Sequence, residues 1–205
     1  MRFASFINEK LTPNGSLTVF DIDETLFTTT AEIGVVKDGK LIKKLSNSEF
    51  NTYKLQPGEK FDFEEFKDAQ KFHNESKPIV KMLDKAKAIL ANSSKNPQSK
   101  VIIITAREDF DNKDIFLNTF RKHGFDIDKV HVHRAGNIKD KVVPAYKKVI
   151  IIKKYLDQHK YGRVRLFDDS MKNLQEFLKM KQEYPDIQFD AYLANHNGSI
   201  KTIKD

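Results

Sequence analysis

Hydrophobic residues along the chain fall into short runs rich in β-branched and aromatic side chains, separated by longer stretches with a different spacing. The short runs are typical of buried strands, because each is brief, apolar and bounded by polar or turn-forming residues. Four are clear and a fifth is plausible. The predicted strands are Ser16–Phe20, Lys100–Ile104, Lys129–His133, Arg163–Phe167 and Gln188–Leu193.

Between the later strands, apolar residues recur every three to four positions, which is the spacing of an amphipathic helix. These helical stretches lie around residues 115–120, 149–156 and 171–178. Strands that alternate with helices predict an α/β doubly wound fold, in which helices cover both faces of a mainly parallel sheet. We therefore expect a five-stranded sheet of this kind, with its ligand beyond the carboxyl ends of the strands.

The segment at residues 27–98 interrupts this alternation, because it is too long for one crossover helix. Asp38-Gly39 stands between two β-prone arms and predicts a tight hairpin. Residues 61–72 and 78–90 then have helical spacing. We expect one domain over 1–205, in which 27–98 forms a flap hairpin and a small helical cap inserted after the first strand, followed by a return helix.

The composition is that of a globular protein, with 39% hydrophobic and 32% charged residues among 205. No apolar run approaches the roughly 20 residues of a membrane span, so we expect no membrane association. The absence of cysteine excludes disulfides and thiolate metal sites and is compatible with a reducing compartment. A cytoplasmic location is therefore the default expectation.

A formal net charge of +7 favours encounter with polyanions or phosphorylated small molecules. The lysines are scattered rather than clustered, so a solubilising surface is the favoured interpretation and a nucleic-acid-binding face is the alternative.

Acidic residues follow two of the predicted strands. Asp21 and Asp23 come after the first strand, Asp168-Asp169 follow the strand Arg163–Phe167, and Thr105 ends the strand that begins at Lys100. The carboxyl ends of parallel strands meet at one edge of a sheet, so these side chains are expected to converge. Neighbouring carboxylates repel one another and favour a cation, and Mg²⁺ prefers such oxygen ligands.

Four motifs in this order resemble those of the haloacid dehalogenase-like (HAD) phosphatase superfamily, which has a Rossmannoid fold. They are Asp21-Ile22-Asp23-Glu24-Thr25, the strand ending in Thr105, Tyr146-Lys147-Lys148 and Leu166-Phe167-Asp168-Asp169. The likeness spans about residues 16–194, and 27–98 stands where that superfamily carries its flap and cap insertion.

The resemblance implies a magnesium-dependent phosphatase. By it, Asp21 attacks phosphorus to form an aspartyl-phosphate, and Asp23 acts as general acid and base. Thr105 would hydrogen-bond the transferring phosphoryl group, Thr25 would belong to the substrate-binding residues, and Lys147 would neutralise charge. The implied magnesium ligands are Asp21, the backbone carbonyl of Asp23, Asp168 and Asp169.

The choice of lysine stays open between Lys147 and Lys148, which are adjacent. We favour Lys147, because Pro144 is expected to start the helix there and to leave this residue near the strand ends.

Substrate contacts are expected from three further residues. Thr105-Ala106-Arg107-Glu108 resembles the Ser-Gly-Arg-Glu of the 3′-phosphatase domain of phage-type polynucleotide kinase-phosphatases, in which the arginine helps to bind phosphate. Arg134 and Asn137 follow the strand at 129–133, at the expected edge of the site. The pair His131 and His133 is interpreted as structural, because no third nitrogen ligand is suggested nearby.

These features favour hydrolysis of a phosphomonoester on a nucleotide or a nucleic-acid 3′ end, with no obligate protein partner. Two alternatives remain. The first is a phosphoprotein phosphatase, because Asp21–Leu26 also resembles the signature of phosphatases that act on polymerase C-terminal repeats. The second is a basic nucleic-acid-binding module that keeps the fold without catalysis.

Overall fold

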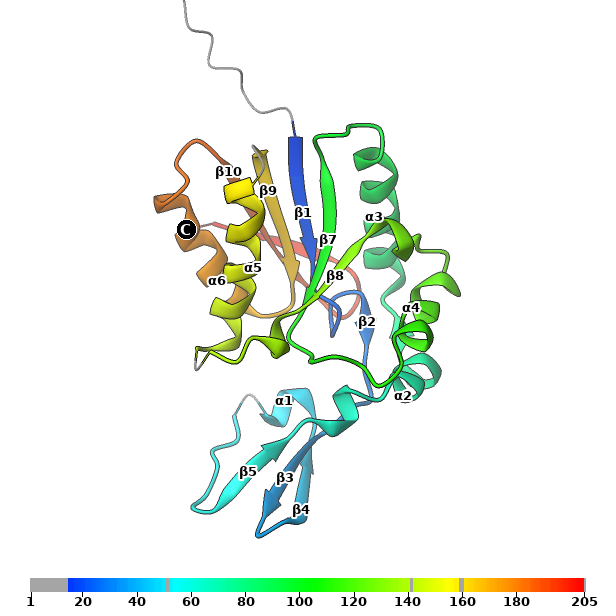
Figure 1. Cartoon of the computed structure of the whole chain (residues 1–205), viewed down its shortest axis with the longest axis vertical. Coiled ribbons are helices and arrows are strands. Elements are labelled where there is room, and N and C mark those ends of the chain that lie inside the picture. Colours follow the sequence, from blue (N-terminus) through cyan, green and yellow to red (C-terminus); the bar gives the residue numbers. More distant parts are fainter. Residues whose placement is uncertain (1–14, 51, 141, 159–160, 205) are drawn as a thin grey trace, which may run out of the picture.

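A sheet of six strands in the order β11-β10-β9-β1-β7-β8 forms the centre of the protein (Figure 1). The computed structural model describes residues 15–50, 52–140, 142–158 and 161–204. Neighbours from β10 to β8 pair in parallel, and β11 is antiparallel to β10. The strands are β1 (Gly15–Phe20), β7 (Lys100–Thr105), β8 (His131–Arg134), β9 (Tyr161–Asp168), β10 (Gln188–Ala194) and β11 (Ile200–Ile203).

Helices cover both faces of this sheet, which confirms the predicted doubly wound α/β arrangement. One face packs against α2 (Ala69–Glu75), α3 (Val80–Ser93) and α4 (Lys113–Arg121). The other packs against α5 (Pro144–Gln158) and α6 (Met171–Lys179). Alternate residues of β1 enter the two cores, Phe20 on the first side and Leu17 and Val19 on the second. A strand buried on both faces is mainly apolar, as β1 is apart from Ser16 and the buried Thr18.

All five predicted strands are present, but the expected total of five is wrong. The sixth strand, β11, follows a tight reversal at Gly198, which has φ of +76°. β11 has only four residues, two of them polar, so it does not stand out in the sequence as a periodic run. In the structure, β10 supplies its hydrogen-bonding partner. The expected start of β8 at Lys129 is also early, because Ile127–Lys129 form a 3₁₀ turn, η2.

The expected hairpin in the inserted segment is confirmed. β3 (Ile33–Lys37) and β4 (Lys40–Leu45) pair across Asp38 and Gly39, whose φ angles of +50° and +75° suit a hairpin turn. β5 (Glu59–Asp62) joins the other edge of β3, and α1 (Asn47–Phe50) lies in the connection. This small sheet, β4-β3-β5, lies beyond the carboxyl ends of β1 and β9 (Figure 1).

The expected helix over residues 61–72 is present only in its last part, since residues 69–72 belong to α2. The insertion carries a small sheet where a helical cap was expected. Phe61 pairs with Val35 in the small sheet, η1 (Glu64–Phe66) follows, and α2 begins only at Ala69. Asp68 starts α2 because its side chain accepts a hydrogen bond from the Lys71 amide at 2.7 Å. The pairing of Phe61 with β3 and the Asp68 hydrogen bond at the start of α2 together override the helical spacing of the phenylalanines.

Short elements connect the inserted segment with the main sheet. β2 (Phe27–Thr28) and β6 (Lys77–Pro78) pair antiparallel, at the beginning and the end of the insertion. The later connections contain η3 (Ala135–Asn137) and η4 (Met180–Gln182). None of the helices in the described ranges combines the length and the apolar character needed to cross a bilayer.

The histidines of β8 contact each other and a tyrosine. The rings of His131 and His133 stack with centroids 5.5 Å apart, and His133 Nε2 lies 2.7 Å from the Tyr155 hydroxyl of α5. Burial lowers the pKa of His133 to about 4, and the neighbouring charges of His131, Lys154, Arg134 and Lys100 act in the same direction. The neutral imidazole is therefore part of the packing between β8 and α5.

This burial predicts a pH dependence of stability. In the unfolded chain His133 takes up a proton near pH 6.5, whereas in the folded chain it does so only near pH 4. The stability that the neutral ring contributes is present above about pH 6.5 and is lost as the pH falls towards 4. Urea unfolding of His133→Gln and the unaltered protein should therefore give a stability difference that shrinks between pH 7 and pH 4.5. A constant difference would contradict the assignment.

Candidate active site

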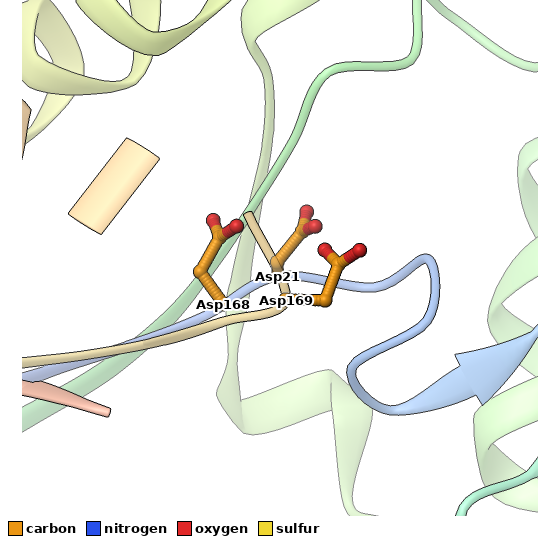
Figure 2. A group of neighbouring side chains, drawn as sticks. All are labelled: Asp21, Asp168 and Asp169. Carbon is orange, nitrogen blue, oxygen red and sulfur yellow. The ribbon is translucent and has the colours of Figure 1, made fainter. Parts of the chain in front are cut away.

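Three carboxylates meet at the carboxyl ends of β1 and β9 (Figure 2). Asp21 follows β1, Asp168 ends β9 and Asp169 comes next, and one oxygen atom from each lies within 4.8 Å of the others. The parallel register aligns Phe20 with Phe167, and the Asp21 amide donates to the Phe167 carbonyl at 3.0 Å. Adjacent parallel strands thus bring together residues almost 150 positions apart, as expected from the sequence.

The Lys148 ammonium bridges two of these carboxylates. Its Nζ lies 2.8 Å from Asp21 Oδ1 and 2.8 Å from Asp168 Oδ2, and only 3% of the side chain is exposed. Burial alone would lower the pKa of Lys148, but the charges of Asp168 and Asp21 outweigh burial and raise it. Lys148 therefore stays charged and neutralises part of the acidic cluster.

We expected Lys147 at this position, but the rotation of α5 about its axis places Lys148 there instead. Ala145, Lys148, Val149 and Ile152 form the buried stripe of the helix, with the spacing of one helical face. Lys147 lies one residue outside that stripe and is only partly buried. The helix begins at Pro144 as expected, but its second lysine is the one that faces the strand ends.

Asp168 is held by more hydrogen bonds than the sequence indicated. Its Oδ1 accepts from the Ser170 amide at 2.9 Å and from Asn173 Nδ2 at 2.8 Å, while Oδ2 accepts from Lys148. Asn173 was not among the expected site residues. One signal for it is present in the sequence. Asn173 lies in the first turn of the helix that follows Asp168-Asp169, and a short amide side chain at that place can reach back to the Asp168 carboxylate.

Burial, and after it the neighbouring negative charges, raise the pKa of two carboxyl groups in the cluster. Burial raises the pKa of Asp21 well above its usual value; Lys148 counteracts this rise, and the other carboxylates add to it. Burial of its carboxyl and the charge of Asp168 raise the pKa of Asp169 to about 7, although part of this residue is exposed. Three carboxylates share one ammonium, so a divalent cation would relieve the remaining repulsion. An all-oxygen donor set suits a hard ion such as Mg²⁺, and the residues present therefore fit a divalent cation.

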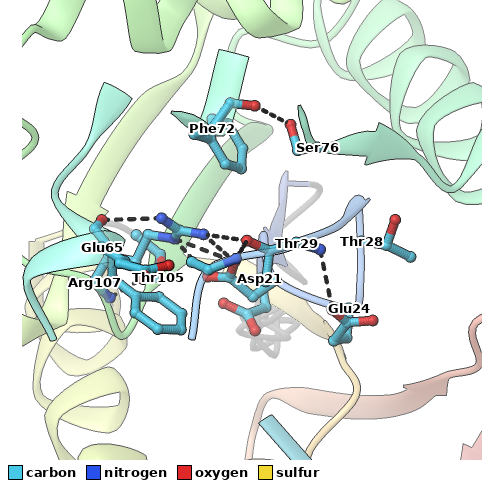
Figure 3. A network of polar contacts seen from close by, with 12 residues as sticks. Asp21, Glu24, Thr28, Thr29, Glu65, Phe72, Ser76, Thr105 and Arg107 are labelled. Atoms are coloured by element: carbon cyan, nitrogen blue, oxygen red, sulfur yellow. Dashed lines mark hydrogen bonds and ion pairs between the residues drawn. The ribbon is translucent and has the colours of Figure 1, made fainter. Parts of the chain in front are cut away.

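Asp23 is held by Arg107, which is labelled in the polar network of Figure 3. Arg107 donates from Nε to Asp23 Oδ2 at 2.9 Å and from Nη2 to Asp23 Oδ1 at 2.6 Å. It also donates from Nη1 to the Phe66 carbonyl at 2.9 Å and from Nη2 to Thr29 Oγ1 at 3.0 Å. The guanidinium lies over the rings of Phe66 and Phe72, 4.7 and 4.9 Å from their centroids.

The hydrogen bonds of Arg107 thus go to protein groups rather than outwards. The residue is 4% exposed and joins the turn after β1 to η1 of the inserted segment. Arg107 was expected to contact substrate phosphate, and the carboxylate of Asp23 occupies it instead. No spacing rule links positions 23 and 107, and only the packing of the loop after β7 against that turn brings them together.

Two threonines expected at the site are fully buried. Thr105, at the end of β7, accepts a hydrogen bond from the Arg107 amide at 3.1 Å. Thr25 lies in the turn after β1, where its amide donates to the Ile22 carbonyl, and its hydroxyl has no partner among the residues described. Thr105 therefore supports the loop that carries Arg107, and Thr25 belongs to the interior of the turn.

Glu24 closes that turn. It takes a left-handed conformation with φ of +56°, and its carboxylate accepts from the Thr29 amide at 3.2 Å and pairs with His196 at 2.9 Å. A non-glycine residue in this region is uncommon and needs such support.

Arg134 and Asn137 lie against the loop that follows Arg107. Arg134 Nε is 3.2 Å from Asp109 Oδ1, and Asn137 Oδ1 accepts from the Asp109 amide at 3.1 Å. Gly136 allows the close approach, because a Cβ there would lie 2.6 Å from the Ala106 carbonyl oxygen. Arg134 also lies over the Phe116 ring of α4, and none of the contacts described for either residue is with the acidic cluster.

Comparison with known proteins agrees with the arrangement of the main sheet. No protein-family model matches the sequence, and no curated protein matches it. Among solved structures, the HAD domain of the effector protein Lem4 from Legionella pneumophila aligns with 90% of this chain and 88% of that chain, with a TM-score of 0.50 and 16% identity. The fold is HAD-like. At this identity the likeness concerns the fold alone, and the roles of individual residues stay predictions.

The bridging position of Lys148 predicts unequal effects for two neighbouring substitutions. Lys148→Gln leaves buried carboxylates without their cation and should lower the free energy of unfolding by about 3 kcal/mol. Lys147→Gln is the matched control on the same helix and should change it by less than about 0.5 kcal/mol. Urea titration at pH 7.5 measures both values, and equal losses would refute the assignment of Lys148.

Proposed function

We propose that this protein is a magnesium-dependent phosphatase that hydrolyses a phosphomonoester through an aspartyl-phosphate on Asp21. The observation that carries the proposal is the position of Asp21, which contacts the Lys148 ammonium and lies next to the carboxylates of Asp168 and Asp169. A nucleophilic carboxylate beside a fixed positive charge and a set of cation ligands is what phosphoryl transfer requires.

In the first step, a carboxylate oxygen of Asp21 attacks phosphorus, and the bond from phosphorus to the ester oxygen breaks. The ester oxygen leaves with the electron pair and takes a proton from Asp23, which enters this step as the protonated acid. In the second step, Asp23 takes a proton from water, whose oxygen attacks phosphorus and displaces Asp21. The products are an alcohol and inorganic phosphate, and both aspartates return to their initial state.

The remaining residues stabilise charge and position the reacting groups. Lys148 offsets the charge that develops on the phosphoryl oxygens and on Asp21. Mg²⁺ held by Asp21, Asp168 and Asp169 would supply further positive charge there. Arg107 orients Asp23 through two hydrogen bonds, and this fixed geometry supports the proposed role of the Asp23 carboxylate as base in the second step.

For the substrate, we propose a nucleotide or a nucleic-acid end that carries a 3′-phosphate, turned over in the cytoplasm. The net charge of +7 supports attraction of such polyanions, and Thr105-Ala106-Arg107-Glu108 resembles the corresponding motif of 3′-phosphatases.

A substitution of the nucleophile tests the reaction. Phosphate release should be screened on mononucleotides, 3′-phosphorylated oligonucleotides and phosphopeptides with Mg²⁺, and EDTA should abolish it. Asp21→Asn should lower kcat/KM by a factor on the order of 10⁴ or more, because the attacking carboxylate is lost. Asp38→Asn, in the hairpin turn of the small sheet, should leave turnover unchanged. Full activity of Asp21→Asn would refute the mechanism, and preferred hydrolysis of phosphopeptides would refute the substrate class.

The contacts of Arg107 predict which kinetic constant it affects. Lysine cannot reproduce the two parallel hydrogen bonds to Asp23, so Arg107→Lys should lower kcat about tenfold or more with little change in KM. Steady-state kinetics measure this split. Arg163→Lys, at an arginine paired with Asp190, is the control and should change neither constant. A raised KM with unchanged kcat would show instead that Arg107 binds substrate phosphate directly.

A further inference from the structure

A hollow of about 360 Å³ lies between α3 and the strands β9, β10 and β11, away from the acidic cluster. One of its walls is the exposed side of α3, with Lys85, Ile89 and Asn92. Its floor is the sheet, with Arg165, Phe167, Tyr192 and Ile200. Sites for small ligands occupy about 300 to 1,000 Å³ and combine apolar walls with a few polar groups, which describes this hollow.

The floor continues a row of stacked aromatic rings. The Phe20 and Phe167 centroids are 4.7 Å apart with an interplanar angle of 16°, and those of Phe167 and Tyr192 are 4.6 Å apart with an angle of 17°. The row crosses β1, β9 and β10 in sequence. Phe20 and Phe167 are buried, while Tyr192 is partly exposed at the end of the row and lines the hollow. Tyr192 thus offers part of its aromatic ring to the hollow.

Arg165 is the unusual group in this hollow. Its Nε is buried and has no hydrogen-bond partner among the described residues, and its Nη2 has only a long contact, 3.4 Å, to Ser16 Oγ. Burial and the nearby Arg163 lower the pKa of Arg165, and Tyr192 and Asp190 counteract this only in part. The neighbouring carboxylate, Asp190, accepts from Arg163 at 2.5 Å. A buried donor without a partner is costly, and an anion would satisfy it.

Two side chains of α3 complement Arg165. Lys85 places a second positive charge on the wall and forms no ion pair with the part of the chain that the structure describes. Asn92 carries a carboxamide, which can both donate and accept hydrogen bonds. No carboxylate is among the residues that line the hollow. The lining therefore offers two cations, an aromatic face and an amide, which suits a ligand with a phosphate and a flat polar ring.

We propose that this hollow is a second binding site, which takes a nucleotide unit with its base against Tyr192 and its phosphate at Arg165 and Lys85. Base stacking on an aromatic side chain beside cationic groups is how proteins bind single nucleotide units, free or within a strand. The site does not depend on the proposed hydrolysis. It is connected to the acidic cluster through Phe167, which stacks in the row and directly precedes Asp168.

Isothermal titration calorimetry of the full chain in EDTA tests the site. Without a cation, the acidic cluster disfavours phosphate, so binding at the hollow is measured separately from the proposed active site. The probes are AMP, ribose 5-phosphate and a single-stranded deoxyadenosine hexanucleotide. Arg165→Gln and Lys85→Gln should each weaken nucleotide binding about tenfold or more, because each removes a charged contact to phosphate. Arg163→Gln and Lys87→Gln are matched controls, since both residues already pair with aspartates.

Two results would support the proposal and identify the source of the nucleotide unit. Binding of AMP that is weakened by both hollow variants indicates a free nucleotide. Tighter binding of the hexanucleotide with the same dependence indicates a nucleic-acid strand. Three results would overturn it. Neither AMP nor the hexanucleotide binds, ribose 5-phosphate binds as well as AMP, or the Arg165 and Lys85 variants bind nucleotide as tightly as the control variants do. If Arg165→Gln does not fold, Lys85→Gln on the helix surface decides alone. None of these outcomes bears on Asp21, because no turnover is measured.

Discussion

The buried contact of Lys148 with Asp21 and Asp168 is the interaction on which the candidate site depends. Two parallel strands that end in carboxylates place like charges side by side, and burial makes their repulsion stronger. A helix on the sheet face supplies the ammonium that makes this arrangement tolerable. One positive charge does not balance three carboxylates, so the cluster is compatible with binding of a divalent cation.

Arg107 pairs with the carboxylate of Asp23, as Lys148 pairs with those of Asp21 and Asp168. Its guanidinium ties Asp23 to Thr29 and to the Phe66 carbonyl, so the turn after β1 and the inserted segment share one buried cation. The orientation of Asp23 thus depends on residues that lie between the main sheet and the small sheet. A displacement of η1 would change the surroundings of Asp23 while leaving Asp21 and Lys148 in place. The two aspartates of the first motif are therefore held by different parts of the molecule.

The sequence predicted the features that depend on local pattern or on strand ends. β1, β7 and β9, the hairpin at Asp38-Gly39 and the meeting of Asp21 with Asp168-Asp169 follow from short apolar runs and from parallel-sheet geometry. What it missed depends on tertiary packing. Pairing with β3 turned Phe61 into a strand residue, and the short β11 is a strand because β10 is its partner. The rotation of α5, rather than its starting residue, decides between Lys147 and Lys148. The contacts of Arg107 with Asp23 and of Asn173 with Asp168 join side chains that no periodicity relates.

The central claim is that Asp21 becomes covalently phosphorylated, and mass spectrometry of the acid-quenched reaction tests it most directly. A substrate identified by phosphate release should be mixed with the protein and Mg²⁺, the reaction stopped in acid within the first turnovers, and the chain digested. We expect one added phosphoryl group on the peptide that contains Asp21, absent without Mg²⁺ and absent in Asp21→Asn. Turnover without that adduct, or with the adduct on another residue, would contradict it.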